Sequence, residues 1–386
     1  MPDTRDVAVR TFLQHMAVEV PPPSTPTPTL LRRARWGIAA RLGGLALVFV
    51  LVASGVAAGV ASLRASNETP ANGSNRVALH VTARVQVNPT PMSVAAGAGS
   101  VWVSHPRSIS RIDPPSTTVI DTIRVVTAGS SPEIGDGTSL GCIQAGFVCG
   151  GGDPGSGDAV GELAFADDAV WATTSDGGGR VVRIDTTNDE IAATIDVPGA
   201  YGVAAGEGAV WVTGWARTTG TLVRIDPATS RPADPLFLDA DVNALAVGGG
   251  SVWVALSGGP VLRIDPVSLE LLATYDPGVD GIDNLAFGGG ALWGAGDGVV
   301  VRLDPTTAEA IETPVSNPVD LEFGGGAMWV SAYDSNEVLA LDPSSGAVIG
   351  RIAVGDSPNG KAFMEGAMWV ALDLDHAVIG LVADSP

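Results

Sequence analysis

The chain has 386 residues, of which 50 are Gly and 27 are Pro, while 16% are charged and 45% are hydrophobic. So many helix breakers and so few charges exclude a coiled coil and a disordered polyelectrolyte, and they leave an all-β fold or a membrane protein. The formal net charge of −21 argues against a nucleic-acid partner, because binding to phosphate groups needs a basic surface.

Residues 42–63 are predicted to form a transmembrane helix. They contain no charged side chain and lie between Arg41 and Arg64. A helix of these 22 residues is about 33 Å long, at ~1.5 Å per residue, which is enough to cross a hydrocarbon core of about 30 Å. A cleaved signal peptide is the alternative, because the small residues at 56–58 suit cleavage, but 41 residues precede the apolar run. We therefore expect a retained signal anchor.

The charges around this segment predict its orientation. Four arginines precede it closely and one follows it, namely Arg32, Arg33, Arg35 and Arg41 before the segment and Arg64 after it. Because positively charged flanks stay in the cytoplasm, residues 1–41, which include a Pro-rich linker, are predicted to be cytoplasmic. Residues 64–77 are then an extracellular linker. The predicted location is the cell membrane, which the chain contacts in a single pass through residues 42–63.

A repeated Trp in an apolar strand dominates residues 78–386. Successive spacings are 69, 40, 42, 40, 36 and 40 residues, and the seven repeat tryptophans are Trp102, Trp171, Trp211, Trp253, Trp293, Trp329 and Trp369. A turn such as Gly97–Ser100 precedes each Trp, and most units continue with a sequence such as Arg111–Pro114. Gly suits positive φ and Asp-Pro favours a type I turn, so both features indicate hairpins. Four short strands per unit predict an all-β fold, a seven-bladed β-propeller.

The two ends of the repeat region predict how the ring closes. The seventh unit stops after its third strand, at 377–382, while residues 82–89 match 349–356, a fourth-strand pattern. The N-terminal strand is therefore expected to complete the last blade, which leaves no open edge between blades. The 69-residue spacing indicates an insertion at about 127–160, which contains Cys142 and Cys149. An oxidising compartment favours a disulfide between them, and two free thiols are the alternative.

The Gly-x-Gly-x-Val-Trp-Val and Arg-Ile-Asp-Pro-x-Thr patterns, over roughly residues 81–384, resemble those of a bacterial group of seven-bladed propellers. The group contains streptogramin (virginiamycin B) lyase and the YncE-like, PQQ-dehydrogenase-like repeat proteins. The resemblance is specific for the fold and weak for function, because propellers host unrelated activities. The lyase would imply a metal-assisted elimination that uses histidines on inner strands. This chain has only His15, His80, His105 and His376, none on an inner strand, so no catalytic residue is carried over.

The first strand of each blade is expected to line a central channel. Seven residues before the repeat Trp (position −7), six blades carry Ala and one carries Glu322. Nine residues before it (position −9), three blades carry Glu162, Asn284 and Asp320. Because alternate strand residues share a face, these four side chains should point into the channel. Hard oxygen ligands around a pore suit Ca²⁺ or Mg²⁺, and hydrated carboxylates in a water-filled channel are the alternative.

A second candidate site lies on the face of the ring that carries the hairpins between strands two and three, called here the hairpin face. The insertion meets this face where strand one of blade two begins. Trp215 is the only Trp of the propeller outside the repeat register, and an exposed aromatic side chain suggests recognition. The other candidate ligand-binding residues in these hairpins are His105, Tyr333, Asp334, Asp375 and His376. The alternative is that the hairpins only pack the insertion onto the ring.

These patterns favour a binding role over catalysis. We expect a membrane-anchored sensor or scaffold whose extracellular propeller binds a protein, a glycan or a small ligand. The alternative is a streptogramin-lyase-like or hydrolytic enzyme with a divalent cation at the mouth of the channel.

Overall fold

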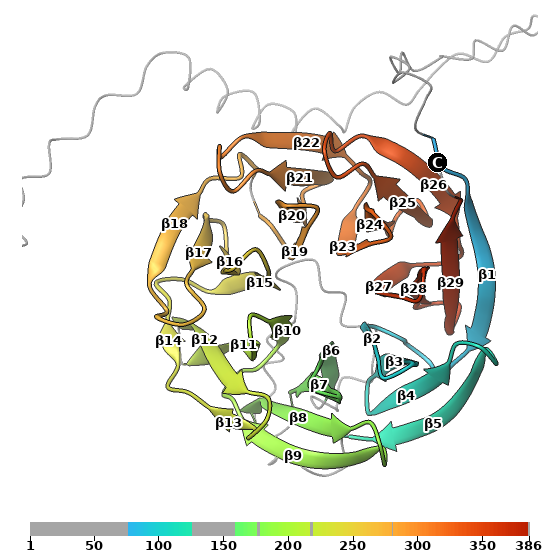
Figure 1. Ribbon diagram of the computed structural model, residues 1–386, viewed down its shortest axis with the longest axis horizontal. Helices are drawn as coiled ribbons and strands as arrows, with labels where there is room; N and C mark the ends of the chain where they lie inside the picture. Colours follow the sequence, from blue (N-terminus) through green and yellow to red (C-terminus); the bar gives the residue numbers. More distant parts are fainter. Residues whose placement is uncertain (1–75, 126–158, 176–177, 217–218, 280, 385–386) are drawn as a thin grey trace, which may run out of the picture. The chain divides into compact units, whose positions relative to one another are not determined.

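A computed structural model describes residues 76–125, 159–175, 178–216, 219–279 and 281–384. They form seven antiparallel sheets arranged as a ring, so the predicted seven-bladed β-propeller is confirmed (Figure 1). Six sheets have four strands, and the sheet of blade three has five because its outer strand is divided into two short pieces.

The first strands of blades one to seven surround the centre of the ring, and they are β2 (Val94–Gly97), β6 (Val160–Ala166), β10 (Gly202–Gly206), β15 (Val242–Val247), β19 (Asn284–Gly288), β23 (Pro318–Gly324) and β27 (Pro358–Met364). The second strands, which carry the repeat tryptophans, are β3 (Ser100–His105), β7 (Ala169–Thr174), β11 (Ala209–Ala216), β16 (Val252–Leu256), β20 (Ala291–Gly296), β24 (Ala327–Ala332) and β28 (Ala367–Leu372). This order confirms that strand one lines the channel.

The third strands are β4 (Ser108–Asp113), β8 (Arg180–Asp185), β12 (Thr219–Asp226), β17 (Val261–Ile264), β21 (Val299–Leu303), β25 (Glu337–Leu341) and β29 (Ala377–Ala383). The outer strands are β5 (Thr118–Arg124), β9 (Glu190–Asp196), the pair β13 (Arg231–Pro232) and β14 (Leu236–Phe237), then β18 (Leu271–Tyr275), β22 (Ala310–Pro314), β26 (Val348–Ala353) and β1 (Leu79–Gln86). The last of these comes from the N-terminal end of the propeller.

The ring closes as the repeat pattern predicts. β1 pairs antiparallel with β29, from Leu79 opposite Ala383 to Gln86 opposite Ala377, and the strand order of this sheet is β1-β29-β28-β27. The N-terminal strand thus supplies the outer strand of blade seven. Because the first and last strands share one sheet, blades seven and one stay adjacent without an open sheet edge between them.

The repeat tryptophans form the core of the blades. Six of them are at most 2% exposed, and Trp369 is 4% exposed. In blades one to six the indole Nε1 donates a hydrogen bond to the carbonyl oxygen five residues earlier, at 3.4 Å for Trp102 and Gly97 and at 3.0 Å for Trp329 and Gly324. This bond ties strand two to the hairpin that precedes it. The buried Trp therefore fills the same core position in each of the seven blades.

The hairpins and turns follow the chemistry that their residues predict. The turn between β2 and β3 has positive φ at Ala98 and Gly99, 50° and 67°. At the end of strand three, an Asp carboxylate accepts backbone N–H groups two or three residues later, as Asp304 does from Thr306 and Thr307 at 2.7 and 3.0 Å. Such bonds lower the pKa of the turn aspartates, and for Asp342, where the Ser344 hydroxyl has the largest effect and the backbone N–H groups add to it, the pKa falls to about 2. The repeated Asp thus serves the turn after strand three in blades one to six.

Several predicted features lie outside the described residues. These are the cytoplasmic segment 1–41, the transmembrane segment 42–63, nearly all of the linker 64–77, and the insertion with Cys142 and Cys149. Within the part of the chain that the structure describes, no helix has the length and apolar character that a membrane span needs. The membrane anchor, its orientation and the disulfide stay predictions.

Candidate functional site

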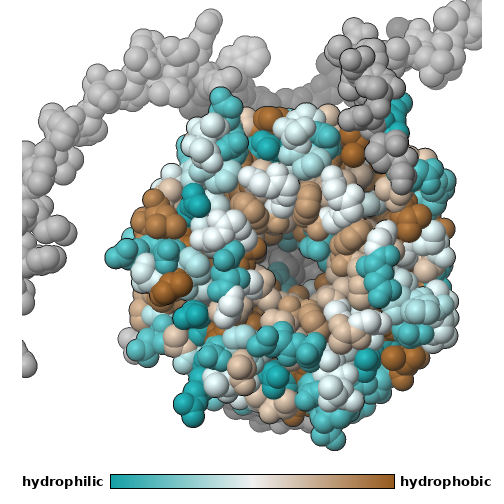
Figure 2. Space-filling model, in the orientation of Figure 1, coloured by the Kyte–Doolittle hydropathy of each residue, from teal (hydrophilic) through white to brown (hydrophobic). Residues whose placement is uncertain are grey.

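The centre of the ring is a cavity of about 490 Å³, lined by the first strands of all seven blades. Figure 2 shows its opening in the middle of the ring. Cavities of roughly 300 to 1,000 Å³ are the usual size of small-molecule sites. Position −7 leaves space in the channel because six blades carry a small residue there, at Ala95, Ala164, Ala204, Ala246, Ala286 and Ala362.

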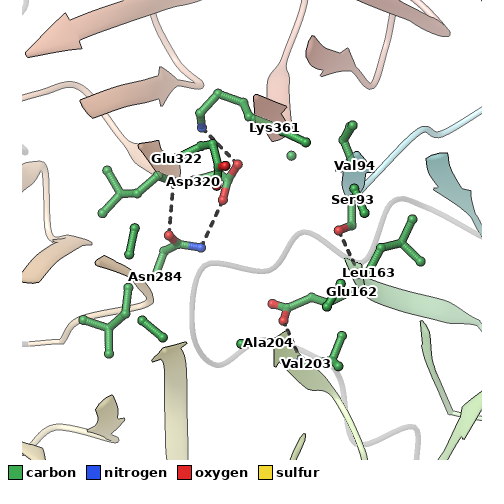
Figure 3. A pocket seen from close by; sticks show the side chains of 18 of the residues that line it. Ser93, Val94, Glu162, Leu163, Val203, Ala204, Asn284, Asp320, Glu322 and Lys361 are labelled. Carbon is green, nitrogen blue, oxygen red and sulfur yellow. Dashed lines mark hydrogen bonds and ion pairs between the residues drawn. The ribbon is translucent and has the colours of Figure 1, made fainter. Parts of the chain in front are cut away.

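The four residues predicted to face the channel all line this cavity. Glu162 comes from β6, Asn284 from β19, and Asp320 and Glu322 from β23 (Figure 3). The register counted from the repeat tryptophans thus places them correctly. The structure also shows that two of them, Asn284 and Asp320, share a hydrogen-bonded network with Lys361, which the alternation of strand residues does not predict.

Polar side chains at position −9 bridge neighbouring blades. Ser93 Oγ accepts a hydrogen bond from Leu163 N at 3.0 Å, and Glu162 Oε2 accepts one from Val203 N at 3.1 Å. Asn284 Oδ1 accepts one in the same way from the N–H of Leu321, at 3.1 Å. In each case the acceptor lies on one blade and the donor on the next. These side chains therefore have a structural function, since they satisfy a backbone donor at the blade interface.

A buried ion pair joins blades six and seven at the channel wall. Asp320 Oδ2 lies 3.0 Å from Lys361 Nζ, and the lysine side chain is fully buried. The ammonium group also donates to Ser331 Oγ at 3.1 Å, and Asp320 Oδ1 accepts from Asn284 Nδ2 at 3.3 Å. Burial lowers the pKa of Lys361, while the nearby charge of Asp320 opposes this shift. A pair of this kind is stable only when its remaining polar atoms are also bonded, as they are here.

The sequence contains a signal for Lys361 that the repeat analysis missed. Lys361 is the only Lys of the chain, and it stands eight residues before Trp369. At this position −8 the other six blades carry aliphatic residues, namely Val94, Leu163, Val203, Leu245, Leu285 and Leu321. A single cation in a row of aliphatic residues marks a blade interface with its own chemistry.

Three carboxylates that line the cavity, Glu162, Asp283 and Glu322, have no cationic partner among the described residues. No ion pair among the described residues includes Glu162 or Glu322. Burial raises the pKa of Glu162 to about 7, and the negative charge of Asp320 adds to this shift. Burial and the charge of Asp320 also raise the pKa of Glu322 to about 7, although Lys361 opposes the shift. Both carboxyl groups are therefore about half protonated at neutral pH.

The predicted divalent-cation site is not preassembled in the described residues. Asn284 uses its oxygen for Leu321 N, and Asp320 is neutralised by Lys361. Within the described ranges, no three His, Cys, Asp or Glu side chains are grouped as metal ligands. Ca²⁺ needs six to eight oxygen ligands, more than the remaining carboxylates offer. Binding of Ca²⁺ or Mg²⁺ stays a prediction that the geometry does not favour.

On the hairpin face, Trp215 is an exposed aromatic side chain as expected. Its side chain is 54% exposed, and its ring lies 5.7 Å from that of Tyr201. Tyr333 is half-buried, and Asp334 is exposed and accepts a hydrogen bond from Asn317 Nδ2 at 3.0 Å. These residues belong to blades three and six, which are not neighbours. They share a face of the ring but not one continuous site.

The hairpins of blades one and seven are more tightly built than expected. His105 is only 2% exposed, because its ring contacts Ser110 Oγ at 3.0 Å and Pro89 O at 3.3 Å. Burial lowers the pKa of His105 to about 4. The expectation that this imidazole lies at the surface of a loop is therefore wrong. The segment before strand one covers it, and that contact is not visible in the repeat.

His376 and Asp375 do lie at the hairpin face. His376 is exposed, and its Nδ1 is 3.0 Å from Asp373 O and 3.4 Å from Thr90 N. Asp375 forms an ion pair of 2.8 Å with Arg84 of the closing strand. His105 of blade one and His376 of the neighbouring blade seven both contact the segment at 89–90, but no hydrogen bond joins the two imidazole rings. They do not form a metal or acid–base pair in this arrangement.

The described residues on either side of the insertion meet the same hairpin. Val125 N donates to Arg107 O at 3.1 Å, and Val160 N donates to Pro106 O at 3.1 Å. Both residues 106 and 107 belong to the turn between β3 and β4. The described residues that flank the insertion therefore lie at the hairpin face.

No model of a known protein family and no curated protein matches this chain. The propeller architecture is established by the structure, whereas the finer grouping with the lyase-like and YncE-like proteins stays a prediction. The function has to be argued from the channel and the hairpin face.

Proposed function

We propose that the chain is a membrane-anchored binding module, a sensor or scaffold, whose exported propeller takes a small ligand into its central channel. The observation that supports this proposal is the position of the exceptions to the repeat. Glu322 replaces Ala at position −7, Lys361 replaces an aliphatic residue at position −8, and both line the same cavity as Glu162. Residues that fold a blade recur in every blade, whereas a ligand site requires asymmetry.

The alternative is a lyase-like or hydrolytic enzyme of the group that the repeats resemble. Its support is the pair Glu162 and Glu322, because carboxyl groups with a pKa near 7 suit proton transfer. The described histidines do not add to it, since His105 is buried and His376 lies in a hairpin, away from the inner strands. A binding role therefore requires fewer functional groups that are still unidentified than a catalytic role does.

The membrane anchor and the export of the propeller rest on the sequence of residues 42–63 and its arginine flanks. A fusion of alkaline phosphatase to the C-terminus tests both, because this reporter is active only outside the cytoplasm. We expect an active fusion in the membrane fraction and an inactive one when residues 42–63 are deleted. An active fusion in the medium would indicate a cleaved signal peptide, and an inactive full-length fusion would contradict export.

A channel-filling variant tests the binding site. Ala204 lines the cavity and is half-buried, so Ala204→Phe places a ring in the channel rather than in the blade core. Ala310→Phe on the exposed outer strand β22 is the matched control. The proteins are purified from native membranes and denatured, and the released small molecules are identified by mass spectrometry.

We expect a molecule that is released by the wild type and by the Ala310→Phe variant but not by the Ala204→Phe variant. The same molecules from all three proteins would contradict a channel ligand. In a parallel crosslinking experiment, a protein partner that Trp215→Ala loses and Ala204→Phe retains would move the site to the hairpin face.

A further inference from the structure

The charges on the channel wall indicate which class of ligand the cavity takes. Asp320 and Lys361 neutralise each other at 3.0 Å. What remains is three carboxyl groups, Glu162, Asp283 and Glu322, none of which is paired with a cation among the described residues. Glu162 and Glu322 are each bonded to a backbone N–H of the following blade. Negative charge on these groups disfavours an anionic ligand.

The two glutamates stand on different sides of the cavity. Glu162 belongs to blade two and Glu322 to blade six, and two blades of a seven-membered ring cannot be further apart than this. Figure 3 shows Glu162 across the opening from Asp320 and Glu322. They also differ in depth, because Glu162 is at position −9 and Glu322 at position −7. One compact ion cannot contact both carboxylates as first ligands in such an arrangement.

The cavity offers both apolar and polar surface between the glutamates. The alanines at position −7 present only methyl groups to the cavity, among them Ala164, Ala204 and Ala246. Asp283, Asn284 and Asp320 interrupt this apolar surface on blades five and six. At Gly202 a Cβ would clash with Thr213 Oγ1, so the threonine hydroxyl already fills the space beside this glycine.

We propose that the channel binds a small aliphatic diamine, with one ammonium group at Glu162, the other at Glu322, and the methylene chain against the alanine wall. This inference rests on the proposed channel-binding function and names its ligand class. A cavity of about 490 Å³ accommodates a molecule of this size together with water. Ammonium groups gain strongly from carboxylates in a desolvated site, and the methylene chain gains from contact with apolar groups.

Binding of a diamine is coupled to proton release. With pKa values of about 7, the two carboxyl groups together carry about one proton at pH 7, which a bound dication displaces. A neutral ligand of the same shape would displace none. The number of released protons is therefore a signature of the proposed contacts.

Calorimetric titration of the full-length purified chain with putrescine tests this inference. We expect saturable binding, a loss of affinity of about tenfold or more for both Glu162→Gln and Glu322→Gln, and no change for Glu309→Gln on the outer rim. Repeating the titration at pH 7 in buffers of different ionisation enthalpy should show release of about one proton. n-Butylamine should bind about tenfold or more weakly, because it reaches only one glutamate.

Equal binding of n-butylamine, or equal affinity of the glutamine variants and the wild type, would overturn the inference. Binding of Ca²⁺ that depends on both glutamates, without putrescine binding, would assign the channel to a metal ion instead. If putrescine fails to bind while Ala204→Phe still loses a co-purified molecule, the ligand class is wrong and the channel-binding function stands. If Ala204→Phe also changes nothing, both proposals fail.

Discussion

Single side chains decide whether a repeated contact is complete in a given blade. The guanidinium group of Arg183 lies over Trp171, at 5.8 Å from the ring centroid, but its buried Nε has no acceptor among the described residues. In blade one the equivalent Arg111 Nε donates to Ser100 Oγ at 2.9 Å. Blade two has Ala169 where blade one has this serine. A buried donor without a partner costs about 1–3 kcal/mol.

Ala169→Ser should therefore raise the free energy of unfolding by about 1 kcal/mol, because it supplies the missing acceptor. The measurement is urea denaturation followed by Trp fluorescence. The control is Ala291→Ser in blade five, where Arg302 Nε already donates to Pro343 O at 2.6 Å, so no gain is expected. An equal gain in both variants would show that the serine acts in some other way.

Asp373 presents the opposite defect, a buried acceptor without a donor. The residue is 6% exposed, and its Oδ1 has no hydrogen-bond partner within the described ranges. Burial raises the pKa of Asp373, although the charge of His376 opposes this. Because the folded protein holds this proton more tightly than the unfolded chain, the carboxylate destabilises the fold once the pH rises above the unfolded pKa of about 4.

Asp373→Asn should consequently be more stable than the wild type at pH 7, and the advantage should disappear as the pH approaches 4. Thermal unfolding between pH 4 and pH 8 measures this difference. Asp375→Asn is the neighbouring control, because it removes the ion pair with Arg84 and should not stabilise the protein at any of these pH values. A stability gain for Asp373→Asn that is independent of pH would rule out the charge as its cause.

At the scale of the strand, the interface between blades six and seven contains an ion pair at a position where the other blades carry an aliphatic residue. Lys361 on β27 fills a position that is aliphatic elsewhere, and Asp320 on β23 pairs with it.

Lys361→Leu should destabilise the protein by about 3–5 kcal/mol, because it leaves a partly buried carboxylate without its cation. The double variant Lys361→Leu with Asp320→Ala recreates the combination of Ala244 and Leu285 in blades four and five, and it should regain most of the loss. Chemical denaturation of the four proteins gives the coupling energy of the pair. Additive effects would contradict a direct ion pair.

On β27, the sequence pattern did not predict the orientation of Lys361. Strict alternation places position −8 away from the channel, whereas Lys361 lines the cavity. β27 has a register shift between Pro358 and Lys361, and β6 has one between Val160 and Leu163. An irregular strand start turns side chains towards the neighbouring blade. Among the channel residues, Glu322 lies where the pairing of β23 is regular and Glu162 lies inside the register shift of β6, and both face the channel as predicted.

For the whole molecule, the features that repeat were predictable and the features that join distant residues were not. The spacing of the tryptophans, the Asp turns and the unmatched strand at 82–89 predicted seven blades and their closure by β1, because each is a local pattern. The burial of His105 depends on the contact between its ring and Pro89 O, and Pro89 lies in the segment between β1 and β2. Likewise, the pairing of Asp320 with Lys361 joins residues 41 positions apart. Only the folded ring brings such residues together.

The stability of the ring should depend on pH through groups of opposite sign. Glu162 and Glu322 have pKa values near 7 in the fold against about 4.5 otherwise, so they make the folded ring less stable as the pH rises from 4.5 to 7. His105, with its pKa lowered from 6.5 to about 4, makes it more stable as the pH rises over a similar range. The two glutamates outweigh the single histidine, so these three groups together make the ring less stable as the pH rises from 4.5 to 7, and the contribution of the glutamates is isolated by difference. The free energy of unfolding of the Glu162→Gln, Glu322→Gln double variant, minus that of the wild type, should rise from pH 4.5 to a plateau above pH 7. Denaturation at closely spaced pH values measures it. A constant difference would mean that neither carboxyl group is perturbed in the fold, and the proton release expected on diamine binding would then be lost as well.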